Sequence, residues 1–179
     1  MKLTEAPAKT ELALRNRHRT RRIHGPLMRR IIRAALASPL LAPACGRAPR
    51  HVLGVVLVGD AEMIELNRRW LGHEGTTDVI AFEYGRGGRV AESEGALRGD
   101  VVISLDTAQR AARRYGTLWQ SEVVRYLLHG FLHLRGFDDR TPSARRQMKQ
   151  AENALLRMVS RRFDLRRLGL PVGGRRLAR

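Results

Sequence analysis

The stretch HVLGVVLVG, residues 51–59, is an uninterrupted apolar run rich in valine. A β-branched run of this length that ends at glycine is typical of a buried strand. Asp60 follows directly and is predicted to cap a short helix that ends near Trp70. A buried strand that leads into a helix indicates an α/β domain, in which helices pack around a sheet.

Further strands and helices are predicted on both sides of this unit. Helical periodicity and capping residues predict four more helices, beginning near Pro26, Asp106, Thr117 and Pro142. Three more segments have strand patterns, namely ELALRNR (11–17), TTDVIAFEY (76–84) and DVVISL (100–105). The chain of 179 residues is therefore expected to form a single small α/β domain. Its elements follow the order β-α-β-α-β-β-α-α-α, with helices packed around a mixed four-stranded sheet.

Local capping signals indicate where two of these helices begin. Asp106 is followed by Gln109 at the spacing of a capping box, and Thr117 is followed by Gln120 at the same spacing. Gly136 is expected to end the helix that starts at Thr117, because glycine adopts the left-handed C-cap conformation without strain.

Both ends of the chain and one internal segment lack a periodic pattern. Residues 1–10 are expected to form an N-terminal tail, and the domain spans residues 11–160. The basic stretch 161–179 is expected to be a disordered C-terminal tail. The Gly-rich, polar segment 85–99 is predicted to be a mobile loop.

The charge balance points to a polyanionic partner. The chain has 34 Lys and Arg residues against 17 Asp and Glu residues, a formal net charge of +17. From Leu12 to Gly59 there are ten arginines and no acidic residue, so the net charge of this region is strongly positive. A basic run is often only a solvated face, but basic runs on both sides of a candidate site favour contact with nucleic acid.

Composition also indicates a soluble protein of a reducing compartment. Cys45 is the only cysteine, so no intrachain disulfide can form. The N-terminus is polar and charged, unlike a signal peptide. The apolar stretch AALASPLLAPAC (34–45) contains two prolines and is too short to cross a bilayer. We expect a cytoplasmic protein with no membrane partner.

The stretch HGFLHLRGFDD, residues 129–139, carries the candidate chemistry. His129 and His133 are four residues apart, so on a helix both project from one face and can reach one metal ion. The glycine that follows lets the chain turn back, and Asp138 or Asp139 can then approach the same ion. Two histidines and a carboxylate leave one position open for a water molecule.

This stretch is also open to two other interpretations. The histidines can also be an incidental pair, packed at the edge of a helix and hydrogen-bonded there. Metalloproteases of the HExxH type place a glutamate base after the first histidine. Gly130 occupies that position, which argues against a protease with that mechanism.

Several segments resemble one known family. HGFLHLRGFDD resembles the HGxLHLxGYDH signature of the YbeY family, the bacterial endoribonucleases of rRNA maturation. LNRRW (66–70) followed by TTDVIAF (76–82) resembles the LNxxYR and TDVLSF segments of that family. RGDVVIS (98–104) resembles its GDIxIS segment, and the likeness covers roughly residues 11–160.

The resemblance implies a fold, an activity and partners. Members of the family have a small mixed sheet with helices and a zincin-like site on a helix, where three histidines bind zinc. They are single-strand-specific, metal-dependent endoribonucleases that act in small-subunit rRNA 3′-end maturation and ribosome quality control. The implied partners are rRNA and the small ribosomal subunit, and the basic ends of this chain fit such a substrate.

The resemblance also implies a ligand set. His129 and His133 match the first two zinc ligands, and Asp139 falls where the family has its third histidine. Asp138 is the second choice for the third ligand. These residues would hold one Zn²⁺ and a metal-bound water for phosphodiester cleavage. Fe²⁺ or another divalent ion also suits two histidines and a carboxylate.

A second departure from the family lies at Leu71. The LNxxYR segment ends in an arginine that is held to matter for cleavage, and Leu71 occupies that position. Arg68 and Arg69 are near but out of register, and with Arg125 they are the predicted RNA contacts. With Asp139, this departure motivates an alternative function, an RNA-binding ribosome-assembly factor with weakened or lost catalysis. A weaker third possibility is a metal-dependent hydrolase of another substrate, with a narrow apolar pocket at the metal.

Overall fold

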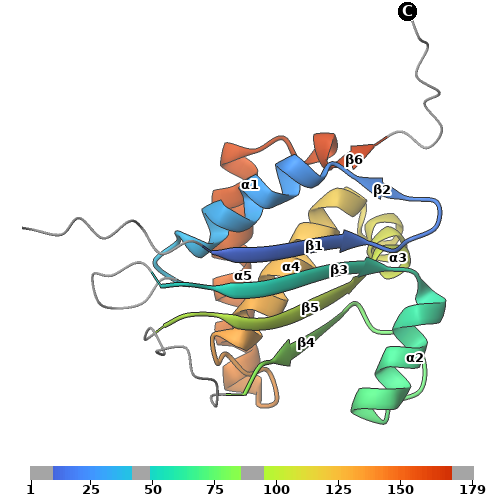
Figure 1. Cartoon of the computed structure of the whole chain (residues 1–179), viewed down its shortest axis with the longest axis horizontal. Helices are drawn as coiled ribbons and strands as arrows, with labels where there is room; N and C mark the ends of the chain where they lie inside the picture. Colours follow the sequence, from blue (N-terminus) through green and yellow to red (C-terminus); the bar gives the residue numbers. More distant parts are fainter. Residues whose placement is uncertain (1–9, 42–48, 86–94, 171–179) are drawn as a thin grey trace, which may run out of the picture.

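The sheet has four strands in the order β1-β3-β5-β4 (Figure 1). The pairs β1–β3 and β3–β5 are parallel, whereas β4 is antiparallel to β5 and forms an edge of the sheet. This confirms the predicted mixed four-stranded sheet. The computed structural model describes residues 10–41, 49–85 and 95–170. The strands are β1 (Glu11–Asn16), β3 (Val52–Val58), β4 (Val79–Glu83) and β5 (Arg98–Ser104).

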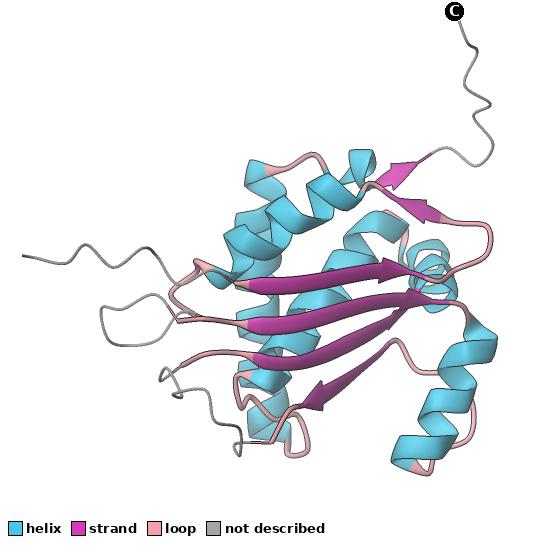
Figure 2. Ribbon diagram, in the orientation of Figure 1, coloured by secondary structure: helices cyan, strands magenta, loops and turns pink. Residues whose placement is uncertain are grey.

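In the described part of the chain, five α-helices accompany this sheet. Helices α1, α4 and α5 gather on one face of it, while α2 stands at the end where the parallel strands finish (Figure 2). None of the helices in the described ranges combines the length and the apolar character needed to cross a membrane. The helices are α1 (Gly25–Leu36), α2 (Asp60–Leu71), α3 (Leu105–Tyr115), α4 (Trp119–Leu134) and α5 (Pro142–Arg162).

The two faces of the sheet bury cores of unequal size. In β5, Val101 and Ile103 belong to the large core beneath α1, α4 and α5. Val102 points to the other face, where it joins Met63 of α2 and Ile80 of β4 in a small cluster. This alternation follows from the two-residue period of a strand. It places α2 and α4 on opposite faces of the sheet.

Helix α4 lies very close to β5 at Gly130. A Cβ atom at this position would lie 2.6 Å from Cγ1 of the fully buried Val101. The side of α4 that carries Gly130 therefore packs on the sheet. A glutamate at this position would collide with β5, so the fold itself does not accommodate the glutamate of an HExxH motif.

We expect Gly130→Ala to lower the free energy of unfolding by about 1–3 kcal/mol, because an added methyl group overpacks the α4–β5 contact. Urea unfolding would measure the change. Gly85→Ala is the matched control, since a Cβ atom at Gly85 meets nothing within 4 Å. Equal stability of the two variants would contradict the close contact.

Helices α2, α3 and α4 begin within two residues of their predicted starts, but the residues predicted to cap them are wrong. The N-cap of α2 is Gly59 rather than Asp60, which is the first helical residue. For α3 the cap is Ser104, whose hydroxyl accepts from the backbone N–H of Thr107 at 3.1 Å. Asp106 instead accepts a hydrogen bond from the buried His18 at 3.0 Å.

Thr117 is likewise not a helix cap. Leu118 is the N-cap of α4 and makes no side-chain capping bond. The hydroxyl of Thr117 donates to Glu122 at 2.7 Å. At α5 the predicted start is confirmed, because Thr141 accepts from the backbone N–H of Ala144 at 3.1 Å.

The chain stays ordered beyond α5, which corrects the predicted tail. A 3-10 helix, η1 (Leu165–Leu168), leads into β6 (Gly169–Leu170), which pairs antiparallel with β2 (Arg22–Ile23). Leu165 and Leu168 are buried in the main core. The prediction of disorder from residue 161 onward is therefore wrong up to Leu170. Residues 1–9, 86–94 and 171–179 lie outside the described residues. They include nearly all of the predicted N-terminal tail, most of the predicted mobile loop and the last nine residues of the predicted C-terminal tail.

Candidate metal centre

Helix α4 presents its two histidines at the edge of the main core. Leu127, Leu128 and Phe131 are fully buried on the core side of the helix. His129 and His133 lie one turn apart and only partly exposed, with ring centroids 4.6 Å apart and an interplanar angle of 79°. Their Nε2 atoms approach within 3.0 Å of each other. This confirms the prediction that His129 and His133 project from the same face of one helix.

The turn after α4 brings a carboxylate to this pair. Gly136 has φ of 96°, a left-handed conformation that suits glycine. After it, Oδ2 of Asp139 lies 3.9 Å from Nε2 of His129. One ligand atom from each of His129, His133 and Asp139 lies within 4.8 Å of the others. In the described part of the chain this is the one such group of histidine, cysteine and acidic residues.

Asp138 has a different role in the turn. Its Oδ1 accepts from the backbone N–H of Asp139 at 2.7 Å and of Arg140 at 3.2 Å. The same atom lies 3.3 Å from Nε of Arg140. Asp138 therefore stabilises the turn, while Asp139 faces the histidines. This arrangement favours Asp139 over Asp138 as the third ligand.

Each histidine has a hydrogen-bond acceptor behind it. Nδ1 of His129 lies 3.1 Å from Oε2 of Glu152, and Nδ1 of His133 lies 3.2 Å from the carbonyl oxygen of Phe137. A carboxylate and a carbonyl can only accept, so each imidazole donates from Nδ1. The neutral rings then direct their Nε2 lone pairs toward the shared centre, as metal-binding histidines do.

The spacing of these atoms fits a zinc ion. Two ligands bound at about 2.1 Å in a tetrahedral site are roughly 3.4 Å apart. The separation is 3.0 Å between the histidines and 3.9 Å from His129 to Asp139, on either side of that value, and it is no more than 4.8 Å from His133 to Asp139. Small side-chain shifts would therefore accommodate the ion. The residues present fit Zn²⁺, and the same donors suit Fe²⁺.

The three titratable partners differ in their electrostatics. Burial lowers the pKa of His129, but the hydrogen bond to Glu152 and its charge outweigh this, so the net pKa is raised. Burial and the neighbouring His129 together lower the pKa of His133. Burial raises the pKa of Glu152, but hydrogen bonds from His129 and Arg125 bring it below its ordinary value. Glu152 is therefore an ionised partner of His129 near neutral pH.

Glu152 was not identified from the sequence, although one signal was present. It lies on α5 in the stripe of buried residues formed by Met148, Ala151 and Leu155. A carboxylate within an apolar helix face needs a partner, because burying an unpaired charge is costly. The missing information was which helix faces α5 at that point.

The predicted RNA contacts fall in two places. Arg125 of α4 donates to Oε1 of Glu152 at 2.6 Å and is therefore engaged next to the metal centre. Arg68 of α2 is exposed and pairs with Glu65 at 3.0 Å. The Arg69 guanidinium lies 5.6 Å from the ring centroid of Trp70, which is 60% exposed. These two arginines are on the opposite face of the sheet from α4, and their contact with RNA stays a prediction.

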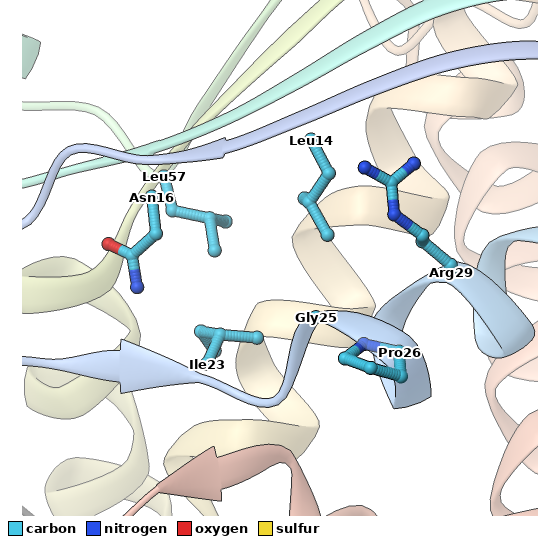
Figure 3. A pocket seen from close by; sticks show the side chains of 7 residues that line it. All are labelled: Leu14, Asn16, Ile23, Gly25, Pro26, Arg29 and Leu57. Carbon is cyan, nitrogen blue, oxygen red and sulfur yellow. The ribbon is translucent and has the colours of Figure 1, made fainter.

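A separate pocket of about 200 Å³ lies between β1, β2 and α1 (Figure 3). It shares no residue with the metal centre. Its polar side chains are used within the fold, since Asn16 donates to the carbonyl oxygen of Arg21 at 2.9 Å and Arg29 to that of Leu12 at 2.8 Å. The pocket therefore does not match the narrow apolar pocket at a metal that the third functional alternative requires.

Comparisons with known proteins agree with the motifs. A protein named Endoribonuclease YbeY from Anaeromyxobacter sp. (strain Fw109-5) is 43% identical over 114 residues, which are 64% of this chain and 57% of that protein. One of the same name from Chlorobium luteolum is 34% identical over 141 residues, which are 78% of this chain and 97% of that protein. This chain therefore spans less than two thirds of the first relative and nearly all of the second.

A solved structure and a family model complete the comparison. The solution structure of TM1509 from Thermotoga maritima has a TM-score of 0.56 and 17% identity, over 84% of this chain and 90% of that one. It supports the fold alone. The family model described as Endoribonuclease YbeY matches residues 13–160, most of the chain. The resemblance found in the motifs is thus confirmed, and the chain belongs to the YbeY family.

Proposed function

We propose that this protein is a zinc-dependent, single-strand-specific endoribonuclease that acts in small-subunit rRNA 3′-end maturation and ribosome quality control. The observation that carries the proposal is the group of ligand atoms from His129, His133 and Asp139 within 4.8 Å of one another. The named relatives support an endoribonuclease. The expected partners are rRNA and the small ribosomal subunit, in the cytoplasm.

The protein side chains have distinct tasks in this proposal. His129, His133 and Asp139 hold the ion, and Glu152 and the carbonyl of Phe137 keep the two imidazoles in place. A zinc ion bound there would lower the pKa of a coordinated water and would polarise a phosphate oxygen. The net charge of +17 attracts the RNA backbone, so binding should weaken steeply as salt is raised.

The test is metal-dependent cleavage by the purified protein. Elemental analysis would measure zinc per chain, and labelled single-stranded and double-stranded RNA of one sequence would be compared as substrates. Cleavage of the single strand should stop with a chelator and return when Zn²⁺ is added. Bound zinc with no cleavage of either RNA would contradict the proposed activity.

A second candidate function is RNA binding without cleavage, in ribosome assembly. Leu71 favours it, because the family's arginine position holds an apolar side chain that is 47% exposed at the end of α2. This candidate predicts salt-sensitive RNA binding that is unchanged after chelation, with no cleavage at any metal concentration.

The variant Leu71→Arg separates the two candidates. An arginine at the exposed end of α2 is compatible with the helix, whose last turn already contains Arg68 and Arg69. A well-placed charge is worth about 10²–10³ in rate, so even imperfect placement should raise single-strand cleavage by about tenfold. Ile64→Arg is the control, since Ile64 is also exposed on α2 and gains the same charge. Equal rates for the two variants would mean that position 71 has no special role.

A further inference from the structure

Glu152 is a mostly buried carboxylate that joins α5 to α4. It belongs to α5, and its side chain is only 12% exposed. Its Oε2 accepts from Nδ1 of His129 on α4 at 3.1 Å, and its Oε1 accepts from Nη1 of Arg125 at 2.6 Å. Both oxygens are therefore occupied, one by a predicted metal ligand and one by a cation.

Arg125 is held in turn by further partners. Its Nη1 also donates to Oδ1 of Asn153 at 3.0 Å, and its Nε lies 3.4 Å from Oε2 of Glu122. The other oxygen of Glu122 accepts from the Thr117 hydroxyl at 2.7 Å. Arg125 is 29% exposed, so much of its side chain packs against α5. These bonds form a continuous set that runs from Thr117, before the start of α4, to His129, and they fix the position of the Arg125 guanidinium.

We infer that Glu152, held in place by Arg125, is a positioning residue for the metal centre. This inference rests on the proposed zinc site. Neither the family motifs nor the group of ligand atoms assigns such a role to Glu152 or Arg125. Glu152 fixes the ring orientation of His129 and keeps its hydrogen on Nδ1, so the Nε2 lone pair faces the ion. Arg125 keeps the carboxylate on Nδ1 and prevents it from swinging toward the ion as a competing ligand.

The two histidines are therefore supported unequally. His133 has the neutral carbonyl of Phe137 behind it, which belongs to the backbone and cannot be removed by substitution. His129 depends on a side chain from another helix. Loss of an outer partner of a metal-binding histidine typically lowers metal affinity by about 10–100-fold. The effect of changing Glu152 should fall in this range.

The experiment measures zinc affinity by competition with a chromogenic chelator for wild type, Glu152→Gln, Glu152→Ala and Arg125→Met. Glu152→Gln keeps one acceptor oxygen and should lose about tenfold, whereas Glu152→Ala should lose about 100-fold. Arg125→Met should lose about tenfold because the carboxylate is no longer held. The visible spectrum of bound Co²⁺ should change in Glu152→Ala, since it reports ligand geometry that a general loss of stability would leave intact.

Glu65→Gln and Arg68→Met are the matched controls. These two residues form an exposed pair on α2, on the opposite face of the sheet, and the same substitutions there should leave zinc affinity unchanged. Circular dichroism would verify that each variant is folded. If Glu152→Ala is unfolded, Glu152→Gln and Arg125→Met decide the question, and wild-type zinc affinity in both would overturn the inference.

Two further outcomes separate this inference from other proposals. If Arg125→Met weakens RNA binding at fixed salt and leaves zinc affinity unchanged, Arg125 is an RNA contact and its positioning role is overturned. Wild-type protein that binds zinc without cutting RNA would contradict the proposed function. The graded loss of zinc affinity would still support the role of Glu152 in that case.

Discussion

Replacing His133 with alanine is expected to remove bound zinc and, with it, cleavage of single-stranded RNA. The change deletes one of three ligand atoms that lie within 4.8 Å of one another. It also removes the ring whose Nε2 lies 3.0 Å from that of His129. Zinc affinity should fall by at least about 100-fold. This is the upper end of the loss seen when a residue hydrogen-bonded to a metal-binding histidine is removed, and loss of the ligand itself should cost no less. Elemental analysis after dialysis and single-strand cleavage assays would measure both effects.

The exposed His73 provides the control for this experiment. It lies in the loop after α2 and belongs to no group that could hold a metal in the described ranges. His73→Ala should keep the zinc content and the cleavage rate of the wild type. If His133→Ala retains as much zinc as His73→Ala, the metal is not bound by α4 and the assigned centre is wrong. RNA binding by His133→Ala should persist, because the charge that attracts RNA is unchanged.

The ligand group is predictable from sequence because its geometry is local. The spacing of His129 and His133 places them one turn apart on any helix, whatever that helix packs against. Gly136 lies three residues before Asp139, so a reversal of the chain at this glycine can bring the Asp139 carboxylate back toward the histidines. The family signature adds which carboxylate to prefer. In the structure Asp138 accepts from two backbone N–H groups of the turn, and Asp139 as the third ligand stays a prediction.

The supporting residues are not predictable in this way because they depend on how helices pack. Glu152 is 23 residues from His129 in sequence, and its role follows from the side of α5 that faces α4. Local patterns do not indicate that Arg125 donates to Glu152 on another helix, and contact of Arg125 with RNA stays a prediction. The prediction of Asp106 as a helix cap is wrong for a similar reason. Its carboxylate accepts a hydrogen bond from His18, which is distant in sequence, and does not cap α3.

The short elements at the chain ends illustrate the same limit at the level of the fold. Strands β2 and β6 have two residues each, too few to give a periodic pattern. These strands form because Arg22 and Ile23 pair with Leu170 and Gly169, which are far away in the sequence. Leu165 and Leu168, just before β6, are buried in the main core. A stretch rich in arginine was expected to be disordered because this long-range pairing leaves no local signal.

Substitutions at Asp139 should change zinc affinity in opposite directions. Asp139→Ala removes the third ligand and should weaken binding by about 100-fold, comparable with the largest outer-partner losses. Asp139→His supplies the donor that the family uses at this position. The site has room for an imidazole, since Asp139 is only partly buried and its Oδ2 lies 3.9 Å from His129. Chelator competition on both variants would measure the two changes, and Asp139→His should bind zinc at least as tightly as the wild type.

Asp138→Ala distinguishes loss of a ligand from loss of the turn. Asp138 accepts from two backbone N–H groups, so its removal should loosen the segment that carries Asp139. Zinc affinity should then fall less than in Asp139→Ala, because the Asp139 carboxylate is still present to bind the ion. If Asp138→Ala has the larger effect and Asp139→Ala binds zinc normally, Asp138 is the ligand. A rise in affinity for Asp139→His together with the smaller loss for Asp138→Ala would fix the third ligand as Asp139.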